Sequence, residues 1–125
     1  ETTSYGAIMQ SGTNTNMEIR AWNTSKAWCN VEATDGSPSI RADFNISSIT
    51  DVGGGEYTVN IDSDLSDANY CVAGVCWENN GSGNHDHHFG LHRSSTYGDI
   101  IGADAFRVQI GPSTQDMDFS AVVHR

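Results

Sequence analysis

The feature that most constrains this chain is a period-two alternation of apolar and polar side chains, broken repeatedly by glycine and asparagine. Successive side chains of a β-strand point to opposite faces, so this alternation is typical of a strand with one buried face. Over 26–33 it places Ala27, Cys29 and Val31 on the buried face. The sequence lacks the 3.6-residue periodicity of an amphipathic helix. We therefore expect an all-β chain.

Further strands are predicted wherever the alternation resumes between turn-forming residues. They cover 6–10, 17–22, 40–49, 56–62, 69–78, 105–110 and 117–123. Gly53, Gly54 and Gly55 predict a hairpin connection over 50–55, because glycine adopts the positive φ angles that such turns need. About seven or eight strands at this spacing indicate a single antiparallel β-sandwich over 1–125, jelly-roll-like or immunoglobulin-like.

Residues 69–78 are apolar at both alternate sets of positions. Such a segment is typical of a strand that is covered on both faces. It is predicted to be a central strand, or one covered by a second sheet or a neighbouring subunit.

Charge narrows the classes of partner. Sixteen acidic residues against six basic ones give a net charge of −10, which disfavours binding to nucleic acid phosphates. No basic patch suits an anionic membrane, and no apolar run has the length of a membrane span. The chain begins at Glu1 without a methionine, and we interpret it as the C-terminal fragment of a longer protein.

The three cysteines, Cys29, Cys71 and Cys76, are an odd number, which does not suit a disulfide framework. Cys71 and Cys76 are five positions apart, so on one strand they face opposite sides and are not expected to pair. We interpret all three as buried free thiols, as in a protein made in a reducing cytoplasm.

Several segments resemble a module found at the C-termini of bacteriophage tail-fibre-type and virion structural proteins, especially of marine phages. The resemblance covers roughly 25–125 and rests on motifs in the same order. The motifs are Lys26-Ala27-Trp28-Cys29-Asn30-Val31, the segment from Ile40 to Asp51, Gly55-Glu56-Tyr57-Thr58-Val59-Asn60-Ile61, the segment from Asp67 to Gly74, Phe106-Arg107-Val108-Gln109-Ile110 and the ending from Phe119 to Arg125.

This resemblance implies a non-catalytic module of the virion, assembled in the host cytoplasm as a homotrimer beside other virion proteins. Its expected role is a distal tail-fibre or spike domain that attaches to a host cell-surface glycan or protein. Two alternatives stay open. One is a purely structural fibre or capsid-decoration domain without receptor contact, and the other is a glycan-degrading depolymerase domain.

The histidine-rich segment 85–92 is not part of the resemblance. His85 and His87 lie on the same side of an extended chain, so three copies around an axis would present six imidazoles to iron or another transition metal. The alternative is a polar loop whose histidines meet solvent or receptor.

Long irregular segments in compact domains are often functional, and 79–95 is the longest one predicted. Its residues and flanking aromatic side chains are the predicted receptor contacts, namely Asp86, His88, His92, Trp77 and Tyr97. No sequence motif frames a nucleophile or a phosphate-binding loop, so no catalytic residue is predicted.

Overall fold

The computed structural model describes residues 7–11, 15–19, 24–34, 36–78, 88–91, 101–111 and 116–125, with 7–11 and 15–19 described by their backbone. These residues contain no helix, and hence none with the length and apolarity of a membrane span. The strands are β1 (Ala7–Ser11), β2 (Thr15–Ile19), β3 (Ser25–Glu32), β4 (Ser39–Phe44), β5 (Ile46–Gly53), β6 (Glu56–Ile61), β7 (Cys71–Trp77), β8 (Phe89–Leu91), β9 (Ala105–Ile110) and β10 (Asp118–His124).

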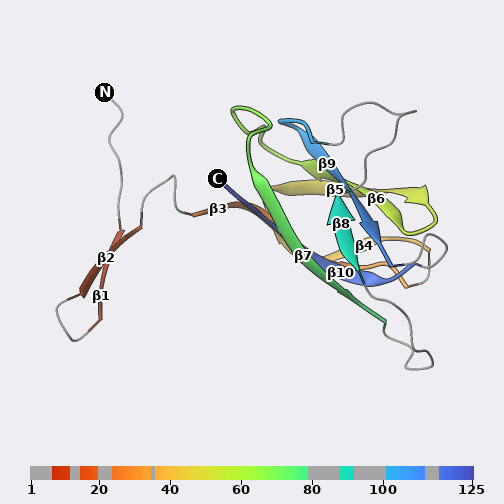
Figure 1. Cartoon of the computed structure of the whole chain (residues 1–125), viewed down its shortest axis with the longest axis horizontal. Helices are drawn as coiled ribbons and strands as arrows, with labels where there is room; N and C mark the ends of the chain where they lie inside the picture. Colours follow the sequence, from red (N-terminus) through yellow and green to blue (C-terminus); the bar gives the residue numbers. More distant parts are fainter. Residues whose placement is uncertain are drawn as a thin grey trace.

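Eight of these strands form two four-stranded antiparallel sheets that pack face to face (Figure 1). Sheet I has the order β4-β3-β10-β7, and sheet II has the order β5-β6-β9-β8. The predicted all-β antiparallel sandwich is therefore confirmed. Within the described part of the chain, β1 and β2 pair only with each other, as a separate hairpin.

The core lies between the central strands of the two sheets. Sheet I contributes Ala27, Cys29, Val31, Phe119, Ala121 and Val123, and sheet II contributes Tyr57, Val59, Ile61, Phe106, Val108 and Ile110. The rings of Tyr57 and Phe119 join the two sheets, with their centroids 5.4 Å apart. The inward positions predicted for 26–33, namely Ala27, Cys29 and Val31, are confirmed.

The predicted strand over 40–49 is wrong, because the chain changes sheet at Asn45. This residue has φ of 58°, a left-handed conformation that asparagine tolerates better than most residues. Its side-chain nitrogen donates to the carbonyls of Lys26 and Ser63, and its side-chain oxygen accepts from the Ser63 amide. The corner puts β4 in sheet I and β5 in sheet II. Ala42 and Phe44 consequently lie at the surface and not in the core.

The hairpin between β5 and β6 is confirmed. Ile49 pairs with Val59 and Thr50 with Thr58, and all three consecutive glycines have positive φ angles. The turn is tighter than predicted, because β5 continues to Gly53.

Two predictions near the irregular segment need correction. Residues 69–78 were predicted to be a central strand, or one covered by a second sheet or a neighbouring subunit. The central position is wrong, since β7 is the last strand of sheet I among the described residues, and Val72 and Cys76 pack one face of it against the core. Within the segment 79–95, which was predicted to be wholly irregular, Phe89–Leu91 forms β8 and pairs with β9.

The cysteines are all free, as predicted, but they are not all buried. Cys29 lies in the core and Cys76 is half-buried, whereas Cys71 is exposed. Cys71 belongs to the set of β7 side chains that points away from sheet II, so the prediction of three buried thiols is wrong for it.

Candidate functional site

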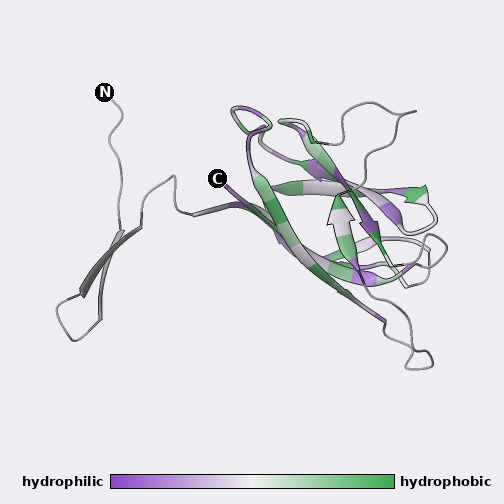
Figure 2. Ribbon diagram, viewed as in Figure 1, coloured by the Kyte–Doolittle hydropathy of each residue, from purple (hydrophilic) through white to green (hydrophobic). Residues whose placement is uncertain are grey.

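The outer face of sheet I carries exposed apolar side chains. On β3, Trp28 and Asn30 alternate with the core residues and therefore point outward. Exposed fractions are 40% for Trp28, 54% for Phe44 and 61% for Val75, and all three residues lie on sheet I. Figure 2 shows β7 in green and pale colours, which mark apolar and neutral residues. Large apolar side chains exposed together are a common mark of a binding surface.

The strand register arranges these side chains in two rows across all four strands. Directly opposite residues of antiparallel strands share one face, which makes each row continuous. One row is Phe44–Trp28–Val122–Ala73, and the other is Ala42–Asn30–Ser120–Val75. None of these eight residues is charged, although the whole chain carries a net charge of −10.

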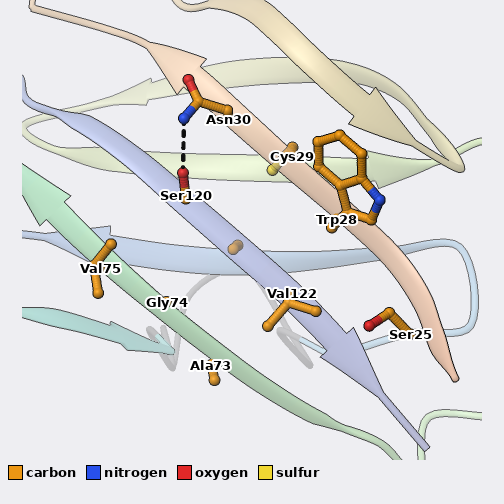
Figure 3. A pocket seen from close by; sticks show the side chains of 10 residues that line it. Ser25, Trp28, Cys29, Asn30, Ala73, Gly74, Val75, Ser120 and Val122 are labelled. Atoms are coloured by element: carbon orange, nitrogen blue, oxygen red, sulfur yellow. Dashed lines mark hydrogen bonds between the residues drawn. The ribbon is translucent and has the colours of Figure 1, made fainter. Parts of the chain in front are cut away.

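A trough of about 600 Å³ lies along the middle of this face (Figure 3). Small side chains on β7 and β10 keep it open between the Trp28 ring and the Val75 side chain. The residues that line it are Ser25, Trp28, Cys29, Asn30, Ala73, Gly74, Val75, Ser120, Ala121 and Val122. We call this feature the outer trough.

Gly74 sets the position of β7 beneath the outer trough. A Cβ atom at this residue would lie 2.5 Å from the ring of Phe89 in sheet II and 2.6 Å from the carbonyl oxygen of Ser120. Any larger residue would push β7 away from β8 or β10. The glycine thus lets the trough-lining strand pack directly on the other sheet.

The polar group of the outer trough is a pair of side chains on adjacent strands. The Asn30 amide nitrogen donates to the Ser120 hydroxyl oxygen at 2.9 Å, and the dashed line in Figure 3 marks this bond. The bond uses one of the two amide N–H groups of Asn30. Within the described part of the chain, the amide oxygen of Asn30 and the hydroxyl proton of Ser120 have no other partner.

Beyond the outer trough, a charged cluster closes one end of sheet I. Its centre is Asp118, whose side chain is fully buried. The carboxylate accepts hydrogen bonds from the Ala33 amide at 3.0 Å and the Thr34 hydroxyl at 2.7 Å. It also forms an ion pair with Arg41 at 2.8 Å, and Arg41 reaches Glu32 at 3.4 Å.

This cluster is a structural anchor. Burial acts to raise the pKa of Asp118, but the hydrogen bonds from Ala33 and Thr34 and the ion pair with Arg41 outweigh it and hold the pKa below its usual value. A second carboxylate, that of Asp116, accepts a hydrogen bond from the Tyr57 hydroxyl at 2.7 Å. Both carboxylates are thus committed to partners that join β10 and the segment before it to neighbouring strands.

The structure places two of the predicted site residues. Trp77 is half-buried at the end of β7, in register with Asp118 and two positions from Val75 on the same face. His88 is exposed, and its carbonyl oxygen accepts from the Gly111 amide. Neither residue lines the outer trough. The other predicted site residues, His85, Asp86, His87, His92 and Tyr97, lie outside the described residues, so their roles stay predictions.

Sequence reasoning missed the outer trough. The available signal was the set of uncharged residues at the central outward positions of β3, β4, β7 and β10, with the charged Glu32 and Asp118 at the strand ends. Joining them requires the strand order, since Asn30 and Ser120 are 90 positions apart in the chain. Within the described residues, no group of histidine, cysteine or acidic side chains is arranged to hold a metal ion.

Comparison of the chain with protein-family models, with curated proteins and with solved structures gives no match.

The buried carboxylate leads to a stability prediction. Asp118→Ala leaves the Ala33 amide and the Thr34 hydroxyl without an acceptor, so the free energy of unfolding should fall by roughly 2–4 kcal/mol. The matched control is Asp64→Ala, at an exposed loop position, which should change the free energy by less than about 0.5 kcal/mol. Urea unfolding at pH 7 measures both variants.

Comparison of the wild type with Asp118→Ala also tests how the free energy of unfolding depends on pH. The pKa of Asp118 is lower in the folded state than in the unfolded state. Its contribution to the free energy of unfolding is therefore complete above the unfolded-state pKa of about 3.9, and is lost as the pH falls through the folded-state pKa. The difference between the wild type and Asp118→Ala should therefore narrow below about pH 4. A difference that stays constant through this range would contradict the assignment.

Proposed function

We propose that this domain is a non-catalytic attachment module of a phage virion, of the tail-fibre or spike type, which binds a glycan or protein of the host cell surface. The observation that carries the proposal is the outer trough, with its exposed Trp28 ring and its uncharged lining on an acidic chain. The resemblance of 25–125 to phage fibre modules supports the virion origin.

The scaffold suits binding because it holds the outer trough in a fixed shape. The trough lies over β3 and β10, which pair with each other at the centre of sheet I and whose inner side chains fill the core. Such a surface loses little conformational freedom when a ligand arrives. Aromatic enrichment and charge depletion are the features that distinguish binding surfaces from the rest of a protein surface.

A second candidate is a structural domain of the virion without receptor contact. It is favoured by Phe44 and Val75, which extend the apolar face to the two edge strands of sheet I. In that case another virion protein covers the same face. Binding to intact host cells separates the two functions, because only an attachment module requires it.

The attachment proposal predicts that the fluorescently labelled chain binds at least one strain in a panel of marine bacteria. Trp28→Ala should lower this binding by about tenfold or more, because an exposed tryptophan in a pocket is a typical energetic centre of an interface. Phe44→Ala is the matched control. It removes an even more exposed aromatic residue, which pairs with Trp28 in register but does not line the outer trough, and should change binding by less than about twofold. Equal binding by the wild type and Trp28→Ala would contradict the proposal.

We also propose the homotrimer and the metal bound by His85 and His87, both of which rest on sequence reasoning. Light scattering combined with elemental analysis of the same peak tests them together. The expected result is three chains with about one iron or similar ion, and His87→Ala should remove the ion. A metal-free monomer would contradict both.

A further inference from the structure

The two rows of the outer trough differ in chemistry. The row through Trp28, Val122 and Ala73 offers a flat indole surface and small apolar side chains. The row through Asn30, Ser120 and Val75 offers an amide and a hydroxyl group about 3 Å apart, in hydrogen-bond contact. Figure 3 shows both rows on the same outer side of the sheet. A ligand lying along the trough therefore meets an apolar platform beside a polar pair.

The polar pair can hydrogen-bond a ligand in both directions. After the bond between them, Asn30 keeps its amide oxygen as an acceptor and one N–H as a donor, while Ser120 keeps its hydroxyl proton. Adjacent hydroxyl groups of a sugar ring, each both donor and acceptor, match such a pair. The faces of many pyranose rings carry C–H groups, which pack on the surface of an indole ring.

The charge of the chain and of the trough lining favours neutral sugars over anionic ones. Among the described residues that line the trough, the only ionisable side chain is that of the core residue Cys29, whose pKa is raised to about 11 by burial. An anionic sugar would meet no positive group in the outer trough and would be repelled by the net charge of −10. A neutral sugar avoids both penalties.

We infer that the outer trough binds a neutral oligosaccharide, with one ring packed on Trp28 and its hydroxyl groups bonded to Asn30 and Ser120. This inference rests on the proposed attachment function and names its ligand. A volume of about 600 Å³ lies within the range of small-ligand pockets. A flat apolar protein surface would instead leave the polar groups of Asn30 and Ser120 buried without partners, which is costly.

The direct test titrates the chain with neutral trisaccharides of glucose, galactose, mannose and N-acetylglucosamine, with sialyllactose as the anionic comparator. The indole N–H signal of Trp28, assigned by its loss in Trp28→Ala, reports binding in NMR spectra. We expect a saturable shift of this signal with at least one neutral trisaccharide and none with sialyllactose. No shift with any neutral sugar at tens of millimolar, or an equal shift with sialyllactose, would overturn the inference.

Variants identify the contacts. Trp28→Ala should weaken binding of the neutral trisaccharide by about tenfold or more, and Asn30→Ala by about fivefold to tenfold. Phe44→Ala, on the same face but outside the outer trough, should change it by less than about twofold. Unchanged affinity in Trp28→Ala would overturn the inference. Near-ultraviolet circular dichroism and thermal melting of each variant establish that it is folded.

The cell-binding assay distinguishes failure of this inference from failure of the proposed function. Cells that lose binding after periodate oxidation of their glycans, and not after proteolysis, support the inference. Cells that lose binding only after proteolysis support the attachment function and overturn the inference that its ligand is a glycan.

Binding of a neutral trisaccharide without binding to any cell supports the inference and contradicts the attachment function. A lower molar mass for Trp28→Ala than for the wild type would show that a second copy covers the outer trough, which also overturns the inference.

Discussion

The pairing of β3 with β10 is the interaction on which the rest of the structure depends. Val31 pairs with Phe119 and Cys29 with Ala121, and these side chains fill the core. The residues between them form Asn30–Ser120 and Trp28–Val122 pairs on the opposite face, in the outer trough. Because side chains alternate with a period of two, a slip of one residue would exchange the two sets. One hydrogen-bonded register therefore determines both the core and the proposed binding surface.

In addition to the packed core, a few polar contacts at the ends of the strands hold the chain within sheet I and between the two sheets. Asn45 turns the chain from sheet I to sheet II. Its side chain bonds to the backbone of Lys26 in β3 and of Ser63, which follows β6. At the other end, Asp118 bonds to Ala33 and Thr34, and Asp116 bonds to Tyr57. The carboxylates of Asp116 and Asp118 thus lie at the ends of strands, where each has a partner. The middle of sheet I carries no charged side chain.

The sequence predicted the fold where one face of a strand is clearly apolar. Alternation identified Ala27, Cys29 and Val31 as inward-facing, and the consecutive glycines located the hairpin after β5. It failed at Asn45, because a single left-handed residue redirects the chain without disturbing the pattern of apolar residues. It failed at β7, because an apolar edge strand facing an open surface has the same composition as a central strand. Cys71 is exposed for the same reason.

The candidate site was less predictable than the fold. A motif search favours residues close in sequence, such as the histidines of 85–92, whose proposed metal and receptor roles remain predictions. The outer trough joins residues of β3, β7 and β10, and only the strand order brings them together. Its most informative sequence property is the lack of charge at the central outward positions of sheet I in an acidic chain, a property that no short motif expresses.

The register of β3 can be measured directly through the three free thiols. Burial raises the pKa of Cys29 to about 11, so this thiol is both shielded and unreactive in the folded chain. Native protein treated with a thiol reagent near pH 8, then digested and analysed by mass spectrometry, should show rapid modification of Cys71 and protection of Cys29 until denaturant is added. Modification of Cys29 at the rate of Cys71 would place Cys29 at the surface, and would contradict the register that turns Trp28 and Asn30 toward the outer trough.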